Sequence, residues 1–155
     1  MDQTKVDGFV ERLFTELNAG MSCMTLYLGY HLGLFQALAD AGPVTPGKLA
    51  RITSYSEKYL REWLECMAAG GYLDYDAQSV EFSLPAEHAA ALLDPDGESS
   101  ALGVIGWIPS LAAALPSLAE SFRTGGGVPY GAYGRDMLMA QGFGTRPMFT
   151  NDLAS

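Results

Sequence analysis

Apolar residues near the start of the chain recur at helical spacing. The intervals between them alternate between three and one, which places them on a single stripe, and charged side chains fall outside it. The stripe consists of Val6, Phe9, Val10, Leu13, Phe14 and Leu17. The pattern predicts an amphipathic helix over this segment.

The next segment, residues 21–42, is apolar nearly all round and must therefore be covered on more than one side. A chain of 155 residues covers one or two of those faces itself, and a partner subunit covers the rest most economically. We therefore predict a homodimer. Gly29 and Gly33 either let a second helix backbone approach closely or only loosen this helix.

From residue 44 to residue 84 the pattern changes to short helices followed by strands. Thr45 and Pro46 are typical of a helix start, and Ser54 with Glu57 has the spacing of a capping box. Two short strand-like runs, 72–75 and 80–84, predict a β-hairpin. Helix, turn, helix and hairpin follow one another as in a winged helix. The predicted fold class is mainly α, a winged helix with additional N- and C-terminal helices.

The C-terminal part is helical in composition from residue 99 to 122. Pro109 and Pro116 each remove a helical hydrogen bond, so we expect two or three short pieces there. The glycine-rich stretch TGGGVPYGAYG, residues 124–134, follows a helical pattern instead of a strand and lacks phosphate-loop spacing, so it is a poor cofactor loop on its own. Residues Met137 to Gln141 are expected to start a last helix. We divide the chain into residues 1–95, the dimerisation and winged-helix domain, and residues 96–155, a helical connecting segment.

The charge balance argues against nucleic acid as a partner. Nine basic residues stand against 18 acidic ones, a net charge of −9, which repels polyphosphates. No Lys or Arg lies between Arg61 and Arg123, so the predicted wing carries no basic side chain.

Groups typical of catalysis or metal binding are sparse. His31 lies within an apolar helix and is expected to be satisfied or at an interface, whereas His88 is expected to face solvent. Cys23 and Cys66 have no second ligand at metal spacing and are interpreted as buried reduced thiols. We predict no catalytic residue and no metal site. The uncharged run 17–39 contains polar residues and lacks flanking basic clusters, so no membrane span is expected, and we predict a cytoplasmic protein.

Several segments in order resemble one family. LGYHLGLFQALADAGPVTPGKLA is similar to the helix and turn that precede the helix-turn-helix in small-molecule methyltransferases using S-adenosylmethionine. REWLECMAAGGYLDYD and FSLPAEHAAALL are similar to their second helix, wing and closing helix, and FRTGGGVPYGAYG and MFTNDLAS to the stretch leading into the catalytic domain. The resemblance covers nearly the whole chain.

The resemblance implies a winged-helix domain that dimerises and walls a substrate pocket ahead of a Rossmann-like catalytic domain. It places Tyr130 and Tyr133 near the mouth of a cofactor or substrate pocket. Met148, Phe149 and Asn151 would border the junction with the catalytic domain. A further set, which lines either the pocket or the dimer seam, consists of Met21, Met24, Tyr27 and His31.

The sequence departs from the family in one respect: no strand with a G-x-G-x-G turn follows. We therefore expect S-adenosylmethionine to be the cofactor of the full-length family but not to bind this chain alone, and we expect the chain alone to be inactive toward its small-molecule substrate. Two alternatives stay open, a stand-alone winged-helix transcriptional regulator and a module that binds a small apolar ligand.

Overall fold

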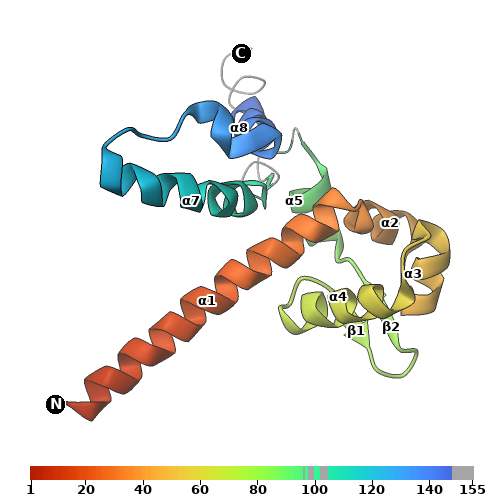
Figure 1. Cartoon of the computed structure of the whole chain (residues 1–155). Coiled ribbons are helices and arrows are strands. Elements are labelled where there is room, and N and C mark those ends of the chain that lie inside the picture. The colour runs from red at the N-terminus through yellow and green to blue at the C-terminus, as the bar shows by residue number, and fades with distance from the viewer. Residues whose placement is uncertain (96, 98–99, 102–104, 148–155) are drawn as a thin grey trace.

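The computed structural model describes residues 1–95, 97, 100–101 and 105–147. Its longest element is helix α1, Gln3–His31, whose first turn is capped by the Asp2 side chain. Figure 1 shows α1 as a rod that extends away from the other elements toward its N-terminus. The predicted first helix and the first half of the apolar segment after it, up to His31, therefore join into one helix, whose only buried residue is Gly29.

Helix α1 ends just before Gly33, whose φ of +69° belongs to the left-handed region that glycine adopts without strain. Helix α2, Leu34–Ala41, begins directly after it. Gly29 and Gly33 consequently do not share a helix face, and both readings of that pair were wrong. Gly29 instead packs against aromatic rings: a Cβ placed there would lie 2.5 Å from Trp63 and 2.6 Å from Phe35.

The winged helix forms where the sequence predicts it. Helices α3, Pro46–Thr53, and α4, Glu57–Ala69, are followed by strands β1, Asp74–Asp76, and β2, Glu81–Ser83. The strands pair antiparallel with Tyr75 opposite Phe82. Val44 forms an isolated bridge to Phe82 through two backbone hydrogen bonds of 2.8 and 2.9 Å, which fastens the wing to the segment before α3.

The two predicted helix starts have different outcomes. Thr45 does cap α3, because its hydroxyl accepts from the Lys48 N–H at 3.2 Å, and Pro46 occupies the first turn. The Ser54 capping box was wrong: Ser54 ends α3 with a φ of +60°, and α4 begins after Ser56, which makes no side-chain cap. Ser54 cannot cap the start of α4 because it already forms the C-cap of α3.

One hydrophobic core joins α2, α3, α4, the wing and the segment after it. Trp63 connects this core to α1, since its indole N–H donates to the Thr25 carbonyl at 3.0 Å and its ring meets Phe35 edge-on at 5.3 Å. Burying apolar surface of this kind is the main favourable term in folding. The buried members are Leu34, Phe35, Leu38, Val44, Leu49, Leu60, Trp63, Leu64, Met67, Leu73, Phe82, Leu92 and Ile105.

The remaining described elements are helix α5, Ala86–Leu93, helix α7, Trp107–Thr124, the 3-10 turn η1, Tyr130–Tyr133, and helix α8, Gly134–Pro147. Helix α7 is continuous through Pro109 and Pro116, so the expected division at these two prolines was wrong. Pro109 lies in the first turn of α7, where no internal N–H bond is needed, and α7 runs on through Pro116. The last helix forms and begins at Gly134, three residues before the predicted start at Met137. Within the described ranges, no helix combines the length and apolar character needed to cross a membrane.

Candidate functional site

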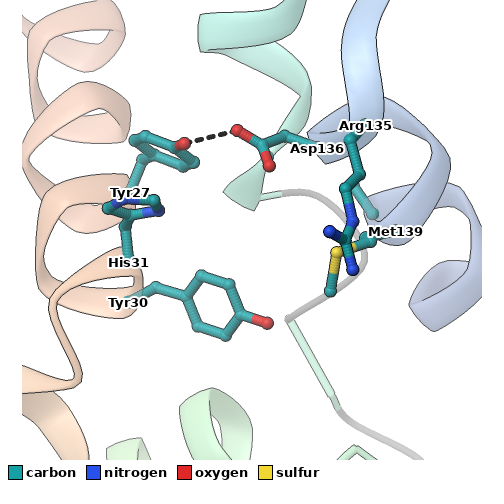
Figure 2. A pocket seen from close by; sticks show the side chains of 8 residues that line it. Tyr27, Tyr30, His31, Arg135, Asp136 and Met139 are labelled. Carbon is teal, nitrogen blue, oxygen red and sulfur yellow. Dashed lines mark hydrogen bonds between the residues drawn. The ribbon is translucent and has the colours of Figure 1, made fainter.

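A pocket of about 430 Å³ lies between α1 and α8. Tyr27, Tyr30 and His31 project from one face of α1, because positions three and four apart lie on the same side of a helix. Figure 2 shows these three facing Arg135, Asp136 and Met139 of α8. We call it the Tyr27 pocket; its lining is Tyr27, Tyr30, His31, Gly106, Arg135, Asp136, Met139 and Ala140.

One hydrogen bond closes the pocket between the two helices. The Tyr27 hydroxyl donates to Asp136 Oδ2 at 2.5 Å, across 109 residues of sequence. The His31 ring stacks on the Tyr27 ring with centroids 5.4 Å apart. The bond to Asp136 raises the pKa of the Tyr27 hydroxyl above its usual value of 10.0, and desolvation and the nearby carboxylate charge act in the same direction. Tyr27 therefore remains a neutral donor at physiological pH.

The pocket offers a mixed chemistry. Tyr30 and the stacked Tyr27 and His31 rings supply flat apolar faces, while Arg135 supplies a guanidinium that forms no ion pair within the described part of the chain. Guanidinium groups bind carboxylate, phosphate or phenolate oxygens through directed hydrogen bonds. The arrangement suits a ring-containing small molecule with polar substituents. The described lining residues include no Ser, Thr, Cys or Lys that could serve as a nucleophile.

The sequence-predicted residues divide between this pocket and the surface. Tyr27 and His31 line the pocket, whereas Met21 and Met24 lie exposed on α1 at 60% and 46% of their surface. Their use in a dimer seam stays a prediction. Met148, Phe149 and Asn151 lie outside the described residues.

Tyr130 and Tyr133 belong to η1, beside α7 and α8. Their rings lie 6.3 Å apart, and the Tyr130 hydroxyl donates to the side-chain oxygen of Gln141. Neither ring lines the Tyr27 pocket. Their predicted place near the mouth of a cofactor or substrate pocket stays a prediction.

Sequence reasoning missed six lining residues: Tyr30, Gly106, Arg135, Asp136, Met139 and Ala140. Tyr30 carried a signal, because it lies three positions after Tyr27 on the same helix face. The α8 residues carried none, since their approach to α1 depends on how α7 and η1 return the chain.

A second hollow, of about 460 Å³, lies where the end of α1 and the start of α2 meet α4. Its lining surface is almost entirely apolar and includes Leu28, Leu32 and Tyr59. We call it the α1–α4 groove; its lining is Thr25, Leu28, Leu32, Leu34, Tyr55, Ser56, Tyr59, Leu60, Glu62, Trp63 and Cys66.

Two expectations about titratable side chains were wrong. His88 is half-buried and its Nδ1 lies 2.9 Å from the Tyr72 carbonyl, so it joins α5 to the segment between α4 and β1 and does not simply face solvent. The cysteines are free but not buried, with Cys23 half-buried and Cys66 exposed. Among the described residues no cluster of His, Cys, Asp and Glu has the geometry to hold a metal.

The second helix of the helix-turn-helix, α4, does not present a basic surface. The Arg61 guanidinium is paired with the Glu57 carboxylate at 2.7 Å, and Glu62 and Glu65 are exposed on the same helix. The adjacent wing carries Asp74, Asp76 and Glu81. Contacts to phosphate dominate affinity for DNA. Helix α4 and the wing offer few basic side chains that could make them.

The comparisons with known proteins agree with this architecture. Residues 19–93 match the family model of the Rv2258c-like winged HTH domain. This segment is therefore a winged helix-turn-helix domain, as the sequence predicts. No curated protein sequence matched the chain.

Solved structures extend the likeness beyond the winged helix. The mitomycin 7-O-methyltransferase MmcR is 22% identical with a TM-score of 0.67, over 99% of this chain and 47% of that one. The N,N-8-amino-8-demethyl-D-riboflavin dimethyltransferase RosA from Streptomyces davawensis is 24% identical with a TM-score of 0.66, over 94% and 45%. CalO1, a methyltransferase in calicheamicin biosynthesis solved with bound SAH, is 20% identical with a TM-score of 0.58, over 99% and 46%.

These likenesses establish the fold. The chain spans about half the length of the solved structures it matches. The resemblance to methyltransferases is thus confirmed for the winged helix and for the helices that follow it.

Proposed function

We propose that this chain is the dimerisation and substrate-lid part of an S-adenosylmethionine-dependent methyltransferase acting on a small molecule. The observation that carries the proposal is the continuous match to methyltransferases over 94–99% of the chain. The match includes α7, η1 and α8, so it is not limited to the widespread winged helix. The helices that form the Tyr27 pocket are therefore part of what is shared.

The cofactor itself does not fit the described residues. A Rossmann-like adenosyl site needs a parallel strand that runs into a glycine-rich turn and a helix N-terminus. The strands of the described ranges form one antiparallel hairpin, and TGGGVPYGAYG follows a helix. In this proposal S-adenosylmethionine is bound by another domain, and no step of methyl transfer is assigned to residues of this chain.

The part assigned to this chain is to wall and orient the substrate. Tyr27, Tyr30 and His31 present ring faces to a planar acceptor, and Arg135 holds a polar substituent of it. Tyr27 and Asp136 together keep α8 against α1, which excludes water from that side. Tyr130 and Tyr133 lie near the pocket mouth in this proposal, with Met148, Phe149 and Asn151 toward the catalytic domain. The protein acts in the cytoplasm as a homodimer.

Ligand titration tests the proposal. Riboflavin is a suitable probe because RosA is named for a riboflavin derivative, and its own fluorescence reports binding. We expect weak, saturable binding that Tyr30→Ala and Arg135→Ala each reduce at least several-fold, with Tyr59→Ala in the α1–α4 groove as the matched control. Calorimetric titration with S-adenosylmethionine is expected to give no binding in the low micromolar range.

Two results contradict the proposal. Tight binding of S-adenosylmethionine would place the cofactor site within this chain. Riboflavin binding that survives both pocket substitutions but is lost in Tyr59→Ala would move the ligand site to the α1–α4 groove, as expected for an apolar-ligand module.

A further inference from the structure

Helix α1 carries a seam of apolar side chains that the other described residues leave exposed. Six residues follow one another at intervals of four, three, four, three and four, the spacing of a coiled-coil seam. Each exposes between 41% and 61% of its surface. We call them the α1 seam: Val10, Phe14, Leu17, Met21, Met24 and Leu28.

The seam is separate from the face that α1 uses within the chain. Leu26 and Tyr30 pack against the core, and Gly29 is buried. At about 100° per residue, Leu26 lies on the opposite side of the helix from the seam. Folding of the winged helix therefore leaves the α1 seam free for another molecule.

The spacing of the seam is the same in both directions, which points to a second copy as the occupant. When two α1 helices run antiparallel about a two-fold axis near Ala19, Val10 of one copy faces Leu28 of the other. Phe14 then faces Met24, and Leu17 faces Met21. A two-fold interface needs such self-complementarity, because the same patch is used on both subunits.

Charge favours the antiparallel arrangement over the parallel one. Residues 2–16 contain four acids against two basic residues, whereas residues 18–31 contain no Asp, Glu, Lys or Arg. In a parallel pair the two acidic halves would repel each other along their length. In the antiparallel pair each charged half lies beside the uncharged half of the partner.

The α1–α4 groove lies at the C-terminal end of the α1 seam. In the antiparallel pair, the N-terminal turns of the second copy reach this end. Leu28 and Leu32 line this groove together with Tyr55 and Tyr59. The same antiparallel register brings Val6 of the second copy beside Leu32. Its first turns would thus enter the groove and extend the contact beyond the two α1 helices.

We infer that a second copy of this chain packs along the α1 seam, antiparallel, with Val10 facing Leu28 and its N-terminal turns in the α1–α4 groove. The inference rests on the dimer in the proposed function and adds its surface and orientation. In this dimer, the first turns of α1 of each copy lie in the α1–α4 groove of the other.

Cross-linking with a short bis-maleimide tests the register in a Cys23→Ala, Cys66→Ala background. The Val10→Cys, Leu28→Cys double variant should give covalent dimers at high yield, whereas either substitution alone should give almost none. Positions 10 and 28 of one helix lie about 27 Å apart, so a short linker cannot join them within a chain. Leu17→Glu with Met21→Glu should convert the dimer to a folded monomer, with Phe122→Glu on α7 as control.

The outcomes separate this inference from the proposed function. Cross-linking of Val10→Cys alone would show a parallel pair and overturn the register. A dimeric mass with no cross-link in the double variant, or one that survives Leu17→Glu with Met21→Glu, would place the interface elsewhere and leave the proposed function standing. A monomeric unsubstituted chain would contradict both.

Discussion

The Tyr27 hydroxyl donates a hydrogen bond of 2.5 Å to Asp136, and this bond joins the helix that carries the winged domain to the last described helix. The two residues lie 109 positions apart in sequence. The contact thus fixes how the C-terminal helices are placed over α1 and gives the Tyr27 pocket its closed side.

Tyr27→Phe removes the donor and should lower the free energy of unfolding by about 1 kcal/mol, the usual net value of a hydrogen bond that is not deeply buried. Thermal and urea unfolding measure this loss of stability. Tyr59→Phe is the matched control, because Tyr59 is exposed on α4. Equal stability of Tyr27→Phe and the unsubstituted chain would show that the bond does not hold α8.

The same bond predicts a pH dependence. The pKa of Tyr27 is raised in the folded chain, so its contribution to stability is fully present below pH 10 and is lost as pH rises through the folded pKa. The difference in stability between the unsubstituted chain and Tyr27→Phe should be constant from pH 7 to 9 and vanish at higher pH. A difference that vanishes below pH 9 would contradict the assignment.

Gly29 is expected to tolerate no side chain. Gly29→Ala should cost about 1–3 kcal/mol, because the new methyl group meets the Trp63 and Phe35 rings and overpacking of this kind strains a core. Gly8→Ala, on the same helix with open space around it, should cost nothing or stabilise slightly through helix propensity. Urea unfolding of both variants decides; equal effects would mean that α1 does not pack on α4 as described.

Val80 ends the wing turn with a φ of +56°, a conformation that is unfavourable for a β-branched residue. Val80→Gly should therefore raise the urea midpoint by an amount equivalent to about 0.5–1 kcal/mol, and Val80→Ala should raise it less. A lower midpoint for Val80→Gly would show that the contacts of Val80 near Phe82 outweigh the strain.

A gel-shift assay distinguishes a methyltransferase part from a regulator. At low salt the chain should not shift duplex DNA, because α4 and the wing expose mostly acidic side chains and Arg61 is paired with Glu57. A shifted band that weakens steeply with added salt would support the stand-alone winged-helix regulator.

The local elements could be predicted from the sequence because each rests on local chemistry. Thr45 with Pro46 marked the start of α3, and two short strand-like runs marked the hairpin. Pro116 misled because one missing hydrogen bond did not divide α7. Ser54 misled because two helix ends lie within three residues.

The candidate site was only partly predictable, since half of it depends on long-range placement. Tyr27 and His31 were named from the family resemblance, in one set with Met21 and Met24. Arg135 and Asp136 resembled any exposed charged pair at a helix start, and only the return of α8 onto α1 gives Asp136 its partner, Tyr27. No local pattern encodes that approach.

The central claim is that this chain is a dimerising part of a larger catalytic arrangement, and its mass in solution tests it most directly. Size-exclusion chromatography with light scattering, at micromolar concentration and physiological salt, should give twice the monomer mass. A single species of monomer mass across the concentration range would contradict the account, because the apolar face of α1 would then remain exposed to water without a partner.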